Sequence, residues 1–198
     1  MPFLKIPRLI LASASPRRAN LLSQIGLKFE IYPSNIPENP PKNSASPEFV
    51  TKELALQKAR SVAERHTEGF VIGADTLVSL EDELLGKPKN TTHAQEMLAY
   101  LSGTCHNVVT GVALIDAKRK TEKTWAETTQ VYFRELCPAE IAAYIETGEA
   151  TDKAGAYGIQ GRGAAFVKRI EGCYFNVVGL PLASLVQELM EFEPDAGT

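Results

Sequence analysis

The segment that most restricts the fold of this chain is Ser13-Ala14-Ser15-Pro16-Arg17-Arg18, which joins an apolar run to a helical one. Residues 9–12 are all apolar and predict a short buried strand. Residues 19–26 predict a helix that ends at a glycine. Ser15 is a residue type preferred at the N-cap, and Pro16 then occupies the first helical position, where a missing N–H costs nothing. The sequence therefore predicts a strand that runs directly into the N-terminus of a helix.

The start of this helix has the chemistry of an anion-binding site. Free backbone N–H groups and the positive end of the helix dipole favour negative charge there. Arg17 and Arg18 offer forked donors that match phosphate oxygens, and Ser13 and Ser15 add hydroxyls. The same residues also suit a capped surface helix with two solvated arginines, so this segment alone leaves both interpretations open.

Composition excludes several classes of protein. The chain has 198 residues, of which 44% are hydrophobic and 23% charged, so it can build a core and does not have the composition of a disordered protein. Its formal net charge of −3 argues against a broad basic surface for nucleic acid. No apolar stretch is long enough to span a membrane and no signal peptide is visible, so we expect a cytoplasmic protein without a membrane partner.

The cysteines agree with that compartment. Cys105, Cys137 and Cys173 are scattered, odd in number and without CxxC spacing, which predicts reduced, buried thiols. The three histidines show no metal-ligand spacing and are expected in surface or structural roles.

The order of the expected elements favours a mixed sheet. Strands are predicted at 9–12, 28–32, 70–74 continuing through 77–80, 108–115 and 124–133, with a hairpin formed by 165–170 and 174–178. Helices are predicted at 16–26, 47–65, from a capping box at 92–95 to 103, at 138–148 and after 181. Because helices and strands are mixed without strict alternation, we expect an α/β fold with a twisted, mixed central sheet flanked by helices, as one domain over residues 1–198.

Two carboxylates are candidates for chemistry. Asp75 follows the apolar run 70–74, at a strand end of the kind where α/β folds bind ligands. Its carboxylate could bind Mg²⁺ or Mn²⁺ or take a proton from an attacking water. Glu38, in a proline-rich loop, could be a second oxygen ligand of the same ion. Each also has an ordinary interpretation, since a strand-terminal Asp is a common cap and a loop Glu is usually only solvated.

Three lysines could supply positive charge. Lys58 lies among apolar and small residues of the second predicted helix, Lys87 in the rigid turn Gly86-Lys87-Pro88, and Lys153 at the mouth of a glycine-rich loop. Any one of them is more often a surface charge than a ligand. Several lysines beside a carboxylate and two arginines would suit a triphosphate.

The glycine-rich loop has four glycines between Gly155 and Gly163. Glycines let a backbone approach a ligand closely, and Gln160 within this loop offers both a donor and an acceptor for the edge of a nucleobase. The alternative is a flexible connection without a ligand, although four closely spaced glycines favour a functional loop.

Together these segments resemble the Maf family of nucleoside triphosphate pyrophosphatases. The matching segments are Ser13-Ala14-Ser15-Pro16-Arg17-Arg18, Gly73-Ala74-Asp75-Thr76, Gly86-Lys87-Pro88, Leu101-Ser102-Gly103, Asp152-Lys153-Ala154-Gly155-Ala156-Tyr157-Gly158-Ile159-Gln160-Gly161 and Val178-Gly179-Leu180-Pro181. They occur in the family's order and cover nearly the whole chain. The subgroup that acts on dTTP and UTP is the most similar.

The resemblance implies a homodimeric, cytoplasmic protein with two lobes around a deep cleft, of the Maf and inosine-triphosphatase type. It implies metal-dependent hydrolysis of a nucleoside triphosphate to the monophosphate and pyrophosphate, with Mg²⁺ or Mn²⁺. It implies a catalytic carboxylate at Asp75 and metal ligands at Asp75 and Glu38. The implied substrate-binding residues are Ser13, Ser15, Arg17, Arg18, Lys58, Thr76, Lys87, Lys153 and Gln160, with specificity at Arg17, Thr76 and Gln160. The chain departs from the family at Pro37-Glu38, where relatives often carry an acidic pair.

Other functions fit parts of the same pattern. A nucleotide-binding regulator of cell division would use the same cleft, with hydrolysis incidental. A 7-methyl-GTP pyrophosphatase, or an enzyme that acts on modified pyrimidine triphosphates, would use the same reaction on another base. Turnover with a divalent ion separates an enzyme from a sensor, and the residues at Arg17, Thr76 and Gln160 favour dTTP and UTP.

Overall fold

The chain forms two compact units in the computed structural model, which describes residues 8–37, 46–81 and 83–192. Within the described residues, unit 1 comprises the chain up to Asp75, Thr110–Ala126 and the chain from Gly179. Unit 2 comprises Thr76–Val109 and Glu127–Val178. None of the described helices is both long and apolar enough to cross a membrane.

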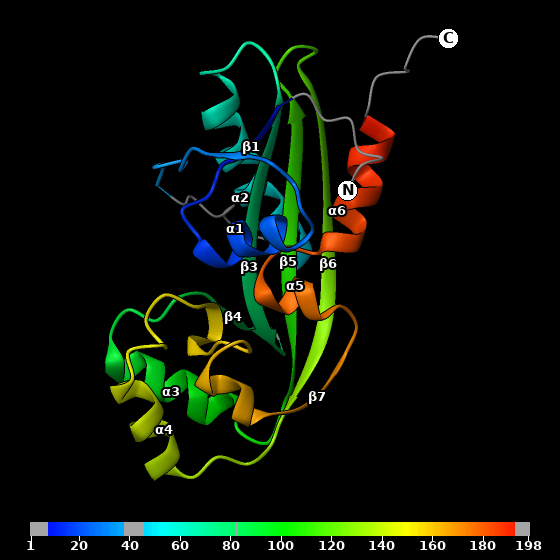
Figure 1. Ribbon diagram of the computed structural model, residues 1–198. Helices are drawn as coiled ribbons and strands as arrows, with labels where there is room; N and C mark the ends of the chain where they lie inside the picture. The colour runs from blue at the N-terminus through cyan, green and yellow to red at the C-terminus, as the bar shows by residue number, and fades with distance from the viewer. Residues whose placement is uncertain (1–7, 38–45, 82, 193–198) are drawn as a thin grey trace. The chain divides into compact units, whose positions relative to one another are not determined.

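Strands and helices are mixed along the chain (Figure 1). The strands are β1 (Leu9–Leu11), β2 (Glu30–Ile31), β3 (Phe70–Leu80), β4 (Glu83–Leu85), β5 (Cys105–Asp116), β6 (Thr121–Phe133) and β7 (Val167–Glu171). The α-helices are α1 (Pro16–Gln24), α2 (Pro47–Ala63), α3 (Thr91–Leu101), α4 (Pro138–Glu146), α5 (Tyr174–Val178) and α6 (Leu182–Phe192). Two 3₁₀ turns, η1 (Ala154–Ala156) and η2 (Arg162–Phe166), lie in and after the glycine-rich loop.

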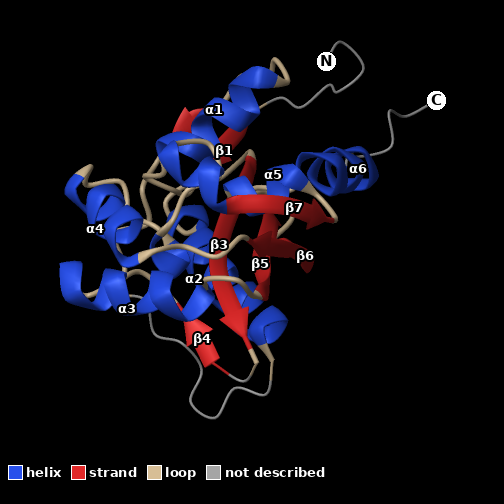
Figure 2. Cartoon of the chain, turned by 90° about the horizontal axis from the view of Figure 1, so that it is seen from below, coloured by secondary structure: helices blue, strands red, loops and turns tan. Residues whose placement is uncertain are grey.

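The sheet is mixed, as the sequence predicts. Its order is β2-β1-β3-β5-β6-β7, with β4 paired to β3. β1 runs parallel to β2 and β3, whereas β4 is antiparallel to β3 and β7 is antiparallel to β6. Figure 2 shows the strands and helices in separate colours. The α/β class, with helices flanking a mixed sheet, is therefore confirmed.

Helix α2 packs on the sheet of unit 1 more closely than side chains would normally allow. A Cβ added at Gly73 of β3 would lie 2.2 Å from the carbonyl oxygen of Ala55 and 2.9 Å from the backbone nitrogen of Ala59. A Cβ at Gly111 of β5 would lie 2.2 Å from the carbonyl carbon of Thr51. Residues 51, 55 and 59 occupy one face of the helix because they are four apart. Gly73 and Gly111 on the sheet therefore face the small residues on one side of α2, Thr51, Ala55 and Ala59.

Helix boundaries follow the sequence signals, with one change of cap. α1 starts at Pro16 after Ser15, and α2 starts at Pro47 after Ser46, whose side chain accepts a hydrogen bond from the Phe49 N–H. The start of α3 was expected at a capping box on Thr92. The cap is instead Asn90, whose side chain accepts from the His93 N–H at 2.8 Å, because an Asn at this position reaches the same free donors.

The expected hairpin of 165–170 with 174–178 is wrong. β7 pairs with β6, and Tyr174–Val178 is a short helix, α5. The reason lies in Asn176, whose buried side-chain amide donates to the Val108 carbonyl at 2.9 Å and to the Thr129 hydroxyl at 2.9 Å. These bonds fix the segment as a helical turn, and a short apolar run fits either structure by pattern alone.

Two further expectations need correction. Asp75 does not end a strand, because β3 continues through it to Leu80. It is instead the last residue of unit 1 within that strand. The cysteines are free but not buried: Cys105 and Cys137 are exposed and Cys173 is half-buried. Cys105 begins a strand and Cys137 caps α4, and the ends of elements lie nearer to solvent than their middles.

The contact of Gly73 with α2 predicts that an added methyl group destabilises the protein at Gly73 more than at a glycine with free space around it. Gly73→Ala should lower the free energy of unfolding by about 1–3 kcal/mol, because the added methyl group would overlap helix backbone, which a rotamer change cannot relieve. Gly86→Ala is the matched control, since among the described residues the nearest atom to its Cβ would be Leu77 Cδ2, at 3.9 Å. Urea unfolding of both variants measures the difference, and equal midpoints would contradict the role assigned to Gly73.

Candidate functional site

The N-terminus of α1 is arranged around the Ser13 hydroxyl. Its Oγ accepts from the Ser15 backbone N–H at 3.2 Å and from Arg18 Nη1 at 3.2 Å. Arg18 Nε donates to the Gly179 carbonyl at 2.8 Å, so this guanidinium joins α1 to the turn before α6. Ser15 occupies the N-cap position, but its side chain makes no capping hydrogen bond within the described residues. The segment therefore presents a fixed Arg18, the Ser15 hydroxyl and the half-buried Arg17 at the start of the helix.

Lys58 and Asp75 form a buried ion pair in unit 1. Lys58 Nζ lies 2.5 Å from Asp75 Oδ1, and the two residues are only 9% and 6% exposed. Lys58 lies on α2 beside Ala59, and Asp75 lies two residues beyond Gly73 on β3. The close approach of α2 at Gly73 brings the ammonium group within reach of the carboxylate. The pair is thus a product of tight packing and would lose its geometry if the helix moved outward.

The register of two parallel strands relates this pair to the start of α1. Leu11 of β1 pairs with Ile72 of β3, and the Ala12 N–H donates to the Ile72 carbonyl at 2.8 Å. Ser13 therefore follows the carboxyl end of β1, next to the part of β3 that runs from Ile72 to Asp75. The carboxyl end of a parallel strand is where α/β proteins bind ligands, although β3 itself continues past Asp75 to Leu80. Within unit 1, cationic groups, hydroxyls and a carboxylate of the expected site belong to this end of β1.

Unit 2 holds the other expected site residues. Thr76 is half-buried on β3, while Lys87 and Gln160 are exposed. The turn that carries Lys87 is joined to the glycine-rich loop, because the Gly155 N–H donates to the Gly86 carbonyl at 3.1 Å. Gly155 has φ +65°, and a Cβ there would lie 2.9 Å from Val78, so glycine is required at this position.

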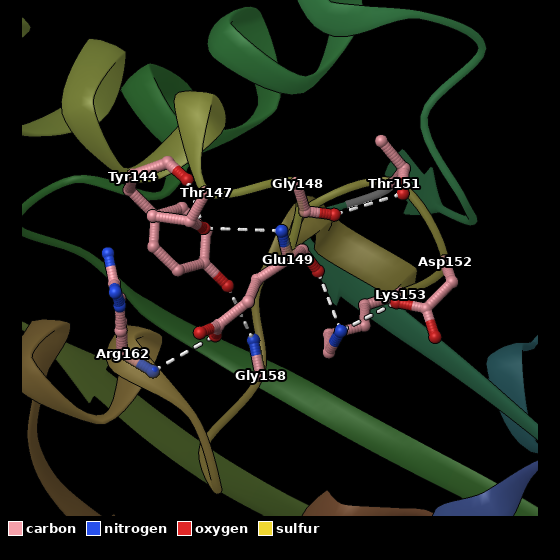
Figure 3. Close-up of polar contacts among 9 residues, drawn as sticks. All are labelled: Tyr144, Thr147, Gly148, Glu149, Thr151, Asp152, Lys153, Gly158 and Arg162. Carbon is pink, nitrogen blue, oxygen red and sulfur yellow. Dashed lines mark hydrogen bonds and ion pairs between the residues drawn. The ribbon is translucent and has the colours of Figure 1, made fainter.

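Lys153 is held within its own loop. Its Nζ donates to the Glu149 carbonyl at 2.6 Å and to Asp152 Oδ1 at 2.6 Å (Figure 3). Its aliphatic stem lies over Gly158, where a Cβ would be 2.7 Å from Lys153 Cε. Lys153 therefore fixes the shape of the loop, a role that its sequence position does not indicate.

The glycine-rich loop packs on an aromatic cluster that the sequence pattern does not predict. Tyr157, from the loop itself, packs edge-on against His106 of β5 and Phe133 of β6, with ring centroids 5.5 and 4.7 Å apart. Phe133 and Tyr144 in turn pack against Phe166. The segment is thus anchored at Tyr157 by large buried rings.

His106 and Tyr157 form a neutral hydrogen-bonded pair inside this cluster. The His106 Nε2 and the Tyr157 hydroxyl are 2.9 Å apart, and His106 is 1% exposed. Burial lowers the pKa of His106 from 6.5 to about 4, and burial raises the pKa of Tyr157 above its ordinary value. Both groups are therefore uncharged near pH 7, and they hold the loop by a hydrogen bond without a net charge.

The described residues contain no group of three or more His, Cys, Asp or Glu side chains that could hold a metal ion. Asp75 is the described member of the expected metal site, and Glu38 lies outside the described residues. The Asp75 carboxylate oxygens are hard donors of the type that Mg²⁺ and Mn²⁺ prefer. Such ions often use one or two carboxylates together with phosphate oxygens and waters. The donor chemistry of Asp75 therefore fits such an ion.

The chain matches the sequence model of the Maf-like protein family over residues 8–192. The chain belongs to the Maf-like protein family. Its Maf-like relatives include a protein of Ruminiclostridium cellulolyticum named dTTP/UTP pyrophosphatase, 52% identical over 177 residues, which are 89% of this chain and 92% of that one. A protein of the same name from Moorella thermoacetica is 52% identical over 188 residues, 95% of this chain and 96% of that one.

A solved structure was also matched. The nucleoside-triphosphatase / dITP/XTP pyrophosphatase of Mycobacterium abscessus aligns with a TM-score of 0.42 and 17% identity, over 72% of this chain and 96% of that one.

The buried ion pair predicts an asymmetric response of stability. Lys58→Met should lower the free energy of unfolding by about 3–5 kcal/mol, because it removes the ammonium group that balances the buried Asp75 carboxylate. Adding Asp75→Asn should recover much of this loss, since the double variant no longer buries that negative charge. Urea unfolding of the single and double variants tests the pair, and a double variant no more stable than Lys58→Met would contradict it.

The buried histidine predicts a pH dependence. Because the folded pKa lies below the unfolded value, the contribution of His106 is complete above about pH 6.5 and is lost as the pH falls toward 4. Between pH 7 and pH 5 the loss should be about 2 kcal/mol. In His106→Phe this part of the pH dependence should disappear, whatever the variant's stability at pH 7. Urea unfolding at both pH values measures this loss. An equal fall in the free energy of unfolding for the unaltered protein and for His106→Phe would refute the assignment.

Proposed function

We propose that this chain hydrolyses nucleoside triphosphates, with dTTP and UTP preferred, to the monophosphate and pyrophosphate. The observation that carries the proposal is the buried Lys58–Asp75 pair, whose carboxylate lies on β3, the strand that pairs with β1 just before the start of α1. The names of its Maf-like relatives, dTTP/UTP pyrophosphatase, support the same reaction and the choice of base. The residues 1–198 would act as one nucleotide pyrophosphatase domain.

In the proposed reaction, a water oxygen attacks the α-phosphorus and the bond from this phosphorus to the bridging oxygen of the β-phosphate breaks. The water loses a proton, and pyrophosphate leaves with the bond's electron pair. Asp75 would orient that water or accept its proton. Arg17, Arg18 and Lys58 would offset the charge that spreads over the phosphate oxygens, which is the main requirement of phosphoryl chemistry.

A divalent cation belongs to this proposal. Asp75, with Glu38, would hold Mg²⁺ or Mn²⁺, and such an ion would neutralise phosphate charge and polarise oxygens when bound. Lys58 would then keep the Asp75 carboxylate oriented from the helix side. Ser13 and Ser15 would add hydrogen bonds to phosphate at the helix N-terminus.

The remaining roles concern the rest of the nucleotide and the protein's setting. Lys87 and Lys153 would contribute positive charge, and Thr76 and Gln160, together with Arg17, would select the base. The Gln160 amide can both donate to and accept from the edge of a pyrimidine. A homodimer in the cytoplasm, without nucleic-acid or membrane partners, completes the proposal.

A panel of substrates tests the function directly. The purified chain is incubated with Mg²⁺ or Mn²⁺ and each natural nucleoside triphosphate, or 7-methyl-GTP, and the release of pyrophosphate and of orthophosphate is measured. We expect pyrophosphate as the direct product, released fastest from dTTP and UTP. Orthophosphate as the direct product would overturn the reaction, and preference for 7-methyl-GTP would overturn the choice of base.

The control for this panel is Asp75→Asn, which should lower kcat by at least about 10²-fold, as loss of a positioned acid or base does. Near-normal turnover of this variant would exclude Asp75 as the catalytic group. Nucleotide binding without multiple turnovers by the unaltered chain would instead favour a nucleotide-binding regulator.

A further inference from the structure

Glu149 contacts the glycine-rich loop near both of its ends. Its backbone carbonyl accepts from Lys153 Nζ at 2.6 Å, and its carboxylate Oε2 accepts from the Arg162 backbone N–H at 2.9 Å (Figure 3). Lys153 precedes the loop's glycines and Arg162 follows Gly161, so one residue holds the segment on either side of Gln160. Gln160 itself is exposed and lies two residues before Arg162.

The glycines of this loop make room for these contacts. A Cβ at Gly161 would lie 2.2 Å from Glu149 Oε2, so any larger residue would displace the carboxylate or the loop. The Gly158 N–H donates to the Tyr144 hydroxyl at 3.2 Å, which adds a third attachment between the other two. A Cβ at Gly163 would lie 3.1 Å from the same hydroxyl. The glycines at 158, 161 and 163 therefore admit side chains of the protein itself.

Glu149 is in turn fixed by the end of α4. Its backbone N–H donates to Thr147 Oγ1 at 3.2 Å, and that hydroxyl donates to the Tyr144 carbonyl at 2.6 Å. The attachments at 153, 158 and 162 thus lead back to the short segment 144–149. A loop held at three points by one rigid segment presents the residue between them in one direction.

We infer that Glu149 is a positioning residue for base selection: it holds the loop so that Gln160 faces the base of the substrate. This inference rests on the proposed function, in which Gln160 contacts the pyrimidine. Glu149 does not itself contact the substrate in this account. Its carboxylate is committed to the Arg162 N–H, and its effect on specificity passes through the loop.

The test compares Glu149→Ala with Glu149→Gln and with Glu146→Ala as the matched control. Glu146 is an exposed carboxylate at the end of α4, outside the contacts described above. Each variant is assayed with UTP and with GTP, and the ratio of the two kcat/KM values measures base selection. Glu149→Ala should lower that ratio about tenfold, comparable with the loss of one charged hydrogen bond. Glu149→Gln keeps an acceptor oxygen and should restore most of the ratio, whereas Glu146→Ala should leave it unchanged.

A second variant disturbs the contact between Glu149 and the loop without removing a polar group. Gly161→Ala adds a methyl group against Glu149 Oε2 at an extended backbone position, with φ −103°, so the backbone itself tolerates alanine. It should reduce the UTP-to-GTP ratio as Glu149→Ala does. An unchanged ratio in both variants would overturn the inference.

Combination with Gln160→Ala shows whether Glu149 acts through Gln160. If it does, Glu149→Ala should not lower the ratio further in a Gln160→Ala background, because coupled residues are not additive. Independent, additive losses would overturn the inference.

Two results keep failure of the inference apart from failure of the proposed function. Hydrogen exchange of the Arg162 amide needs no activity, and it should become faster in Glu149→Ala but not in Glu146→Ala; equal protection would overturn the inference alone. An unchanged ratio in Gln160→Ala would instead remove the base contact from the proposed function, and with it the role of Glu149 in base selection.

Discussion

The close contact of α2 with the sheet of unit 1 is the constraint on which the candidate chemistry depends. Gly73 and Gly111 have no side chains to hold the helix away, and α2 meets them with Thr51, Ala55 and Ala59. Interiors are packed tightly enough that a single extra methyl group is felt. Because the helix lies this close, the Lys58 ammonium reaches the Asp75 carboxylate at 2.5 Å while both remain almost completely buried. The close packing of the α2 backbone on the sheet therefore brings the two charged groups of the candidate site together.

Glycines have a parallel role in unit 2, but there they face side chains rather than a helix backbone. Gly158 lies under the stem of Lys153, and Gly161 lies against the carboxylate of Glu149. A glycine-rich sequence is usually associated with close approach of a ligand. At these two positions the protein's own side chains occupy the space that a Cβ would fill. Gln160, an exposed residue of the same segment, then gains a fixed orientation from contacts that it does not make itself.

The sequence predicted most of the fold because its local signals agreed with one another. The strand and helix on either side of Ser15-Pro16 and the two long strands β5 and β6 have clear patterns, and they were confirmed. The helix at Tyr174–Val178 was missed because the buried Asn176 amide, paired with two residues distant in sequence, decides its conformation. Tertiary contacts of this kind leave no local pattern.

The site was predicted only as far as residue types can show. The motifs named Lys58 and Asp75 separately, but their pairing across 17 positions requires the helix to pack on the strand. The motifs did not predict the roles of His106 and Glu149, because a lone histidine and a loop glutamate have no distinctive spacing. Lys153 was named as a cation, and the structure adds that its ammonium group donates to the Glu149 carbonyl.

In the proposed function, the buried pair would let a carboxylate serve a substrate as anionic as a triphosphate. An isolated Asp75 would repel the phosphates and would itself be costly to bury without a charged partner. With Lys58 at hydrogen-bond distance, the two residues are together close to neutral, so the carboxylate keeps its oxygens without presenting a full negative charge. Arginine and hydroxyl groups at the start of α1, which follows β1, would then meet the phosphate directly. In the proposed function, Lys58 would therefore first balance the charge of Asp75, and the helix start would offer most of the positive charge to the substrate.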